Sequence, residues 1–594
     1  MTNRHPTLSR NTLSRSIRHA VTQALSIAVA ATLAGVLSGC ISTPPDETFD
    51  PRALGDRHRQ AASTILPAER LDRSDKLDSP YLSTDPAKGP DKQGRDPLLR
   101  PLDQISQTVK LDLRDAVQRA VVTNNDIRVS AYQPGIDEAR VVEAEQRFAP
   151  TLFSSFEATR GNQPVGLARQ SFGGPESRSN SLNITAQTGI RQLLPSGGQV
   201  ELSAQGQRAE DFSDNGTTNY ESVLNLQLTQ PLLRDFGLDV NRARIVINRN
   251  NQVVSTLDFR RQVEESVAEV ERIYWQLAQA ERDLQIQQEL LERTLSYANI
   301  LYQRRDQDAS RVSISQANAR VESRRASLVR ARSRVGDLSD QLKLLINDPQ
   351  YPVGGGTLIS ADTNAVTQQI IVDPKEQIET ALQYRFELAQ QQLRVDNARV
   401  TLNVAKNNLL PQLDLVLRGG LNGVDDSLAG STGNAANVRG EDGANYTAAV
   451  GFQFEIPIGN GAARAIFRRQ QLTVMQSITS YKATIDQVTT DVQRAIREID
   501  TTWQEMVRTR QSAFAARDAL DAIEVRERAG EPLTPTFVDL KLSLLENLAQ
   551  AASSEAASIA NYNIALSNLE RTKGTLLRYN NIVLKEDRML PRGR

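Results

Sequence analysis

Three long stretches of this chain contain no residue that breaks an α-helix. Neither glycine nor proline occurs in residues 238–335, 462–529 or 536–573. Helices in globular proteins usually run for about 8–20 residues, so stretches of this length indicate coiled coil. Apolar residues recur at spacings of three, four and seven in the first stretch: Val263, Val267, Val270, Tyr274, Leu277, Leu284, Leu291, Leu295 and Ala298. This pattern predicts a heptad seam on a helix over residues 240–305, roughly 100 Å long at about 1.5 Å per residue.

The long stretches are expected to fold as two helical hairpins. In the second hairpin the turn is marked by Gly530, Pro532 and Pro535. In the first, the polar segment 306–310 is the candidate turn, although it holds neither glycine nor proline. We therefore expect long hairpins over about 238–346 and 461–577.

Segments between the helical stretches alternate between apolar and polar residues. The alternation is clearest in 223–230 and 446–456, and 151–158 and 413–417 are further candidates. A period of two is typical of β-strands with one apolar and one polar face. The connecting segments, such as 419–445, are rich in glycine, asparagine and serine.

The order of these elements occurs twice. A helical run ends at Pro150 and a second one at Pro411, about 260 residues later. Strand, proline and long helix then follow around Pro231 and again around Pro457, a smaller offset of about 225 residues. We therefore divide the chain into a first repeat (106–349), an inter-repeat linker (350–372), a second repeat (373–584) and a C-terminal tail (585–594).

The difference between the two offsets gives the first repeat about 35 additional residues in its strand region. They contain a hairpin-like pair, 182–192 and 198–205, around Pro195. Such a pair either adds two strands to a barrel, which preserves its up-and-down parity, or folds outside it. Because Arg191, Gln199 and Glu201 give the pair only a weak lipid-facing stripe, we expect a surface hairpin.

The N-terminus has the features of a targeting segment. Arginines precede an apolar core over about 24–37, which ends in Leu-Ser-Gly and then Cys40, the only cysteine of the chain. This resembles a bacterial lipoprotein signal (1–39), in which the cysteine is acylated, and Ile41 favours the outer membrane by that resemblance. Residues 40–105 are polar and rich in proline, so we expect a lipidated tether.

The duplicated order resembles the TolC-type outer-membrane efflux proteins across nearly all of residues 106–584. Specific similarities lie in 230–237 (QPLLRDFG), 457–464 (PIGNGAAR) and 273–278 (IYWQLA). The resemblance implies an α+β membrane protein: a trimeric transmembrane β-barrel continued by a long periplasmic α-helical coiled-coil barrel. Each protomer would supply four strands and four helical elements. Strand-to-helix junctions are expected at Pro150, Pro231, Pro411 and Pro457.

The function that the resemblance implies is a passive conduit of a tripartite efflux or type I secretion system. Its partners would be two further copies, outer-membrane lipid, a periplasmic adaptor protein and an inner-membrane transporter. The substrate remains open among drugs, metals, other small molecules and polypeptides. The alternative is a lipid-anchored periplasmic coiled-coil scaffold without a pore, but a scaffold has no need of alternating strands.

Nothing in the sequence indicates catalysis. The three histidines, His5, His19 and His58, form no cluster suited to metal binding or nucleophilic chemistry. A formal net charge of −1 gives no basic excess for nucleic-acid binding. We expect neither an enzyme, a hydrolytic lipoprotein included, nor any cofactor beyond the lipid on Cys40.

Carboxylates near the hairpin tips are candidates for a periplasmic gate. Asp539 follows the second tip, and Glu546 lies seven residues later, on the same helical face. In a trimer such acids would form rings that favour cations. The alternative is an ordinary solvated helix face. Asp306 and Asp308, at the first tip, are the next candidates.

Overall fold

The computed structural model of the chain describes residues 108–164, 178–212, 218–306, 310–436, 445–532 and 534–584. All of these belong to one compact unit, Glu69–Arg594. The expected signal segment, the tether with Cys40, Asp308 and the C-terminal tail lie outside the described residues.

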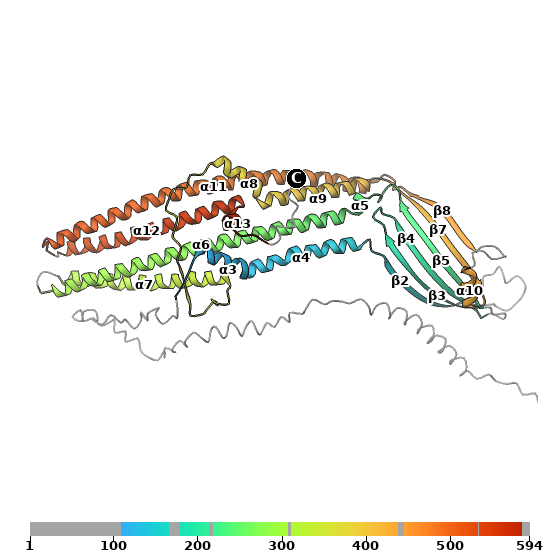
Figure 1. The fold of residues 1–594 in the computed structure, drawn as a ribbon, viewed down its shortest axis with the longest axis horizontal. Helices are drawn as coiled ribbons and strands as arrows, with labels where there is room; N and C mark the ends of the chain where they lie inside the picture. Colours follow the sequence, from blue (N-terminus) through green and yellow to red (C-terminus); the bar gives the residue numbers. More distant parts are fainter. Residues whose placement is uncertain are drawn as a thin grey trace, which may run out of the picture. The chain divides into compact units, whose positions relative to one another are not determined.

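Two long helical hairpins dominate the described residues (Figure 1). The first consists of α6 (Ala243–Gln303) and α7 (Arg311–Ile346), and the second of α11 (Gly461–Arg528) and α12 (Pro535–Lys573). The helices of each hairpin pack against each other, and α6 also packs against α12. The heptad positions of α6 supply two apolar cores, one around Tyr274 and one, nearer the tips, around Tyr297 and Leu301. None of the described helices combines the length and the low polarity that crossing a membrane requires.

Two shorter helices begin each repeat and have the same lengths in both. In the first repeat they are α3 (Leu113–Thr123) and α4 (Asn125–Gln146), and in the second α8 (Pro374–Tyr384) and α9 (Phe386–Asn407). Both pairs of equivalent helices keep the offset that separates Pro150 from Pro411. Asn124 starts α4 because its side chain accepts hydrogen bonds from the first free backbone N–H groups.

The strands form one antiparallel sheet at the far end of the helices (Figure 1). Its strands are β2 (Thr151–Pro164), β3 (Arg178–Leu193), β4 (Gln199–Asp211), β5 (Thr218–Pro231), β7 (Gln412–Asp425) and β8 (Tyr446–Glu455), in that spatial order. A short helix, α10 (Leu428–Ala436), lies between β7 and β8 in the chain. Two single-turn helices, α5 (Leu238–Asn241) and α13 (Leu576–Tyr579), complete the described helices.

The expectation of a surface hairpin around Pro195 is wrong. The two segments form β3 and β4, which lie inside the sheet between β2 and β5. Arg191 and Glu201 are direct cross-strand partners on one face, while Ile190 and Leu202 are partners on the other. The polar residues that argued against a barrel position therefore all point to one side and leave the opposite side apolar.

A small parallel pair of strands, β1 (Thr108–Leu111) and β6 (Leu358–Ala361), ties the inter-repeat linker to the first repeat. The buried phenol of Tyr274 holds both segments: it donates to the carbonyl of Leu111 and accepts from the N–H groups of Asp362 and Thr363. The linker is thus fixed across the middle of α6.

Candidate channel wall and hairpin gate

The six-stranded sheet has one apolar face. Paired residues lie on the same face, and the pairing runs without a bulge through all six strands. One row of partners consists of Val200, Leu228, Leu417 and Val450. Large exposed side chains on this face are Leu152, Phe156, Ile190, Leu202, Leu224, Leu226, Val450, Phe452 and Phe454. We call this surface the apolar face.

The opposite surface, the polar face, carries charged residues along the whole height of the sheet, whereas those of the apolar face lie only at its outer end. Its neighbouring row of partners consists of Arg191, Glu201, Gln227, Arg418 and Ala449. Other ionisable residues on the same face are Glu157, Glu221, Asp414 and Glu455. An apolar exterior and a polar interior are the arrangement that a membrane β-barrel requires.

The height of the apolar face matches a membrane. On β7 it extends from Leu413 to Gly423. Ten residues at about 3.3 Å span roughly 33 Å along the strand, which becomes about 25 Å along a barrel axis after a tilt of ~40°. This is the height of the apolar band of an outer-membrane barrel.

Each of the prolines expected at the strand-to-helix junctions lies next to a strand end: Pro150, Pro231, Pro411 and Pro457. At these junctions the two repeats are hydrogen-bonded to each other. The N–H of Leu232 donates to the carbonyl of Leu413 at 2.7 Å, and the N–H of Arg234 donates to that of Pro411 at 3.3 Å. The helices therefore join the sheet through a shared, rigid seam.

The two candidate gate acids of α12 face arginines of the other hairpin. Glu546 accepts from Arg320 at 2.6 Å and lies 2.8 Å from the guanidinium of Arg324. Asp539 lies 3.7 Å from Arg320. The hydrogen bond from Arg324 lowers the pKa of Glu546, against the opposing effect of partial burial. Carboxylates that converge in a ring repel one another unless positive charge lies nearby. Arg320 and Arg324 supply that charge within the protomer, and the sequence analysis did not single out either arginine.

At the first hairpin tip, Asp306 is the one candidate acid among the described residues. Asp306 lies just beyond α6, with 85% of its side chain exposed, and pairs only with the adjacent Arg305 at 3.4 Å among the described residues. Asp308 lies outside the described residues.

Two carboxyl groups of α6 are buried among the helices. Glu264 and Glu271 are 4% and 3% exposed. Asn580 donates to Glu271 at 2.7 Å, and the backbone N–H of Leu577 bonds to Glu264. Burial raises the pKa of Glu271 and raises that of Glu264 to about 8, although Arg385 and Arg571 act in the opposite direction. Glu264 is therefore largely protonated at neutral pH, where it joins α6 to α13.

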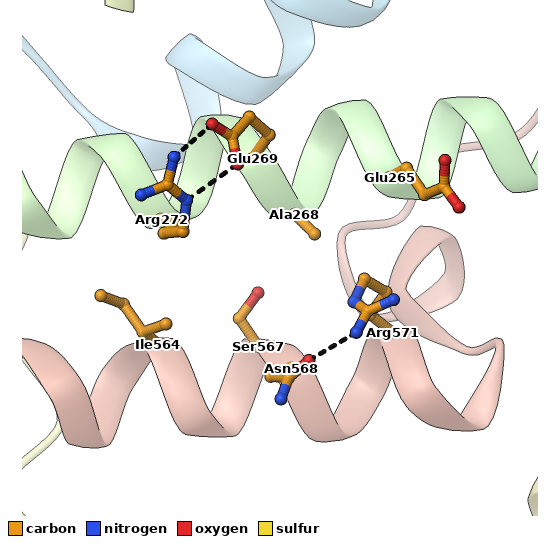
Figure 2. Close-up of a pocket in the computed structure, with 8 residues that line it drawn as sticks. All are labelled: Glu265, Ala268, Glu269, Arg272, Ile564, Ser567, Asn568 and Arg571. Carbon is orange, nitrogen blue, oxygen red and sulfur yellow. Dashed lines mark hydrogen bonds and ion pairs between the residues drawn. The ribbon is translucent and has the colours of Figure 1, made fainter. Parts of the chain in front are cut away.

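A groove of about 430 Å³ separates α6 from α12 beside these acids (Figure 2). It is lined by Glu265, Ala268, Glu269, Arg272, Ile564, Ser567, Asn568 and Arg571. Both arginines of the groove have hydrogen-bond partners within it. Arg272 donates to Glu269, and Arg571 donates to Asn568 at 2.8 Å. In the described part of the chain, no group of three or more His, Cys, Asp or Glu residues could hold a metal ion.

Residues 377–569, which contain most of the second repeat, match the family model of the outer membrane efflux proteins. Over these residues the chain is similar to the outer membrane efflux proteins. The resemblance to TolC-type efflux proteins that the sequence motifs indicated is thereby confirmed. A comparison with curated protein sequences finds no match.

Solved structures share the fold of this chain over most of their own length. A membrane protein from Pseudomonas aeruginosa is 17% identical, with a TM-score of 0.57 over 78% of this chain and 93% of its own. The outer membrane protein VceC from Vibrio cholerae is 15% identical, with a TM-score of 0.55 over 78% of this chain and 96% of VceC. The Campylobacter jejuni CmeC outer membrane channel is 14% identical, with a TM-score of 0.54 over 78% of this chain and 86% of CmeC. The order of helices and strands in this chain is therefore that of known outer-membrane channels.

We predict that the free energy of unfolding of this protein depends on pH through Glu264. Because folding raises the pKa of this acid from about 4.5 to about 8, its contribution is complete below pH 4.5 and is lost as the pH rises through 8. Glu264→Gln, which stays neutral, should unfold at a higher temperature than the wild type at pH 8.5 and at a similar temperature at pH 5.

Thermal unfolding followed by circular dichroism measures this effect. Glu265→Gln is the matched control. The carboxylate of Glu265 is next to Glu264 in the sequence, but it is half-exposed and pairs with Arg261 at 2.6 Å. Equal unfolding temperatures of Glu264→Gln and the wild type at pH 8.5 would show that Glu264 is ionised and well solvated in the folded protein.

For the gate, we predict that Asp539→Ala/Glu546→Ala weakens cation selectivity and block by divalent cations, while trimers still assemble. The double variant removes two acids near the hairpin tips and leaves Arg320 and Arg324 unneutralised. Single-channel recordings measure both properties. Glu138→Ala/Glu376→Ala, which removes two exposed acids from shorter helices, is the control. Unchanged selectivity and block in the tip variant would assign these acids to an ordinary solvated face.

Proposed function

We propose that this chain forms a trimeric channel through the outer membrane, the exit conduit of a tripartite efflux or type I secretion system. The observation that carries the proposal is the six-stranded sheet with an apolar face, a polar face and two free edges. Within the described residues, β2 and β8 each pair on one side only. In lipid, every unpaired backbone group costs several kcal/mol, so such edges must be joined.

Copies of the same chain are the simplest means of joining the edges. Cyclic symmetry lets β8 of one copy pair with β2 of the next until the ring closes. Three copies, as in the family that the chain resembles, supply eighteen strands. The polar face then lines the lumen, and the apolar face contacts lipid.

Six strands per protomer widen the barrel beyond the four-stranded pattern of the family. At a strand spacing of about 4.8 Å and a tilt of ~40°, eighteen strands give a backbone diameter of about 36 Å, against about 24 Å for twelve. The number of long helices per protomer is unchanged, so a wide barrel would open above a narrower helical tunnel.

The helical hairpins would form the periplasmic part of the conduit. Their tips are the expected docking site of a periplasmic adaptor protein, which would connect the channel to an inner-membrane transporter that supplies the energy. The channel itself would be passive and catalyse no reaction. Drugs, metals, other small molecules and polypeptides all remain candidate substrates.

A lipid-anchored scaffold without a pore fits the structure less well. A scaffold has no use for a sheet whose apolar face exposes Phe452 and Phe454, at 69% and 62%, to the surroundings. Exposed apolar surface of this kind marks contact with lipid or protein.

We predict that the purified protein conducts ions across a planar lipid bilayer. Val450→Arg places a charge on the apolar face, where it costs about 2–4 kcal/mol near the middle of the membrane, and should strongly reduce channel insertion. Gln453→Arg, on the polar face of the same strand, should insert like the wild type and alter ion selectivity.

Two outcomes would contradict the channel. One is the lack of any conductance from correctly folded wild-type protein. The other is equal insertion of Val450→Arg and Gln453→Arg, which would show that neither face of β8 contacts lipid.

We also propose that Cys40 carries covalent lipid, which anchors the mature protein before the barrel inserts. Acyl chains contribute about 0.8 kcal/mol per buried CH₂ group. Mass spectrometry of the mature protein should find an acylated Cys40, and Cys40→Ala should abolish both acylation and signal processing. An unmodified Cys40 in the mature protein would refute this anchor.

A further inference from the structure

Helix α10 lies on the apolar face of the sheet, in a row of small residues. On β3, β4, β5 and β7 this row of cross-strand partners consists of Ala186, Gly206, Ser222 and Gly423, and it ends on β2 with Phe156. A Cβ atom at Gly423 would lie only 2.0 Å from the carbonyl oxygen of Ser431. The backbone of α10 therefore rests directly on the sheet, at a place where larger side chains would hold it away.

Hydrogen bonds fix α10 in this position. The hydroxyl groups of Ser222 and Ser431 lie 2.9 Å apart, and Ser431 is fully buried. The side-chain amide of Asn434 donates to the carbonyl of Val424 at 3.1 Å and to Asp425 at 3.2 Å. α10 is thus a docked part of the wall and not a loose loop.

The side of α10 that points away from the sheet is exposed and uncharged. At about 3.6 residues per turn, Ala429, Gly433 and Ala436 lie opposite Ser431, and all three are exposed. Leu428, at the edge of this surface, is 55% exposed. No residue from 427 to 436 carries a charge. This surface continues the apolar face of the sheet outward.

Charged and aromatic residues begin in the next row of the sheet, which α10 also contacts, through Asp425. The next row on the same face consists of Arg208, Tyr220 and Asp425. Arg208 lies over the ring of Tyr220, 5.9 Å from its centre, and pairs with Glu210 at 3.1 Å. Aromatic residues beside charges mark the edge of the apolar band of a membrane barrel.

We propose that α10 is a lipid-contact helix that lies at the outer boundary of the membrane, with its exposed side against the acyl chains just below the headgroups. This inference rests on the proposed channel, because it needs the apolar face to contact lipid. The occupant is lipid because the surface is uncharged, continuous with the apolar face and adjacent to the charged boundary row.

The physical role of α10 follows from the row on which it lies. Gly206 and Gly423 have no side chains to cover the sheet backbone, so lipid would meet polar groups there. The helix supplies the missing apolar volume, with its own backbone groups hydrogen-bonded within the helix.

Fluorescence quenching by lipid tests the position of α10. The trimer is reconstituted in phosphatidylcholine whose acyl chains are brominated near the headgroup end in one sample and near the middle of the bilayer in a second sample, and each site is read in the sample that matches its depth. Single cysteines labelled with a fluorophore are compared at Ala429→Cys on α10, Val450→Cys on the apolar face and Gln453→Cys on the polar face. The wild-type chain, with Cys40 alone, gives the background.

We expect a loss of fluorescence at Ala429→Cys comparable to that at Val450→Cys, and none at Gln453→Cys. Quenching at Val450→Cys without quenching at Ala429→Cys would overturn the lipid contact of α10 and leave the channel intact. If Val450→Cys is not quenched, or Gln453→Cys is quenched equally, the proposed orientation of the sheet fails, and the inference about α10 fails with it.

Discussion

The cost of leaving backbone N–H and C=O groups unpaired in lipid is the constraint from which the proposed assembly of this protein follows. One chain provides six paired strands with an apolar face, but β2 and β8 remain free on their outer edges among the described residues. The helices cannot cover these edges, because they leave the sheet at its end, through the junctions around Leu232 and Leu413. In the proposed channel, closure by further copies would remove the edges and create a polar lumen in the same step.

Much of the fold could be predicted because its patterns are local and periodic. The heptad positions from Val263 to Leu277 are buried as their spacing predicts. Strand alternation in 223–230 and 446–456 is equally regular, and both segments are strands. The duplicated helices of 11 and 22 residues follow the proline offset closely. The heptads and the strand alternation depend only on residues a few positions apart in the chain. Such local patterns can be read from a single sequence.

Features that depend on distant partners could not be predicted. The hairpin around Pro195 lies inside the sheet and not outside it, as its polar residues suggested. Arg191 and Glu201 are cross-strand partners and share the polar face, but this register cannot be read from the sequence. The parallel pair of β1 and β6 joins two short segments from distant parts of the sequence, and neither is long enough to give a periodic signal. The arginines that meet Glu546 lie on α7, in the other hairpin, although their spacing at 320 and 324 places them on one helical face.

Electron cryo-microscopy of the purified protein in lipid nanodiscs tests the closed barrel most directly, because it resolves individual strands around the pore. Our account predicts a threefold ring of eighteen strands, with β8 of each protomer paired to β2 of the next and the polar face lining the lumen. A ring of twelve strands with β3 and β4 folded outside it, or sheets that remain open at β2 and β8, would contradict the account.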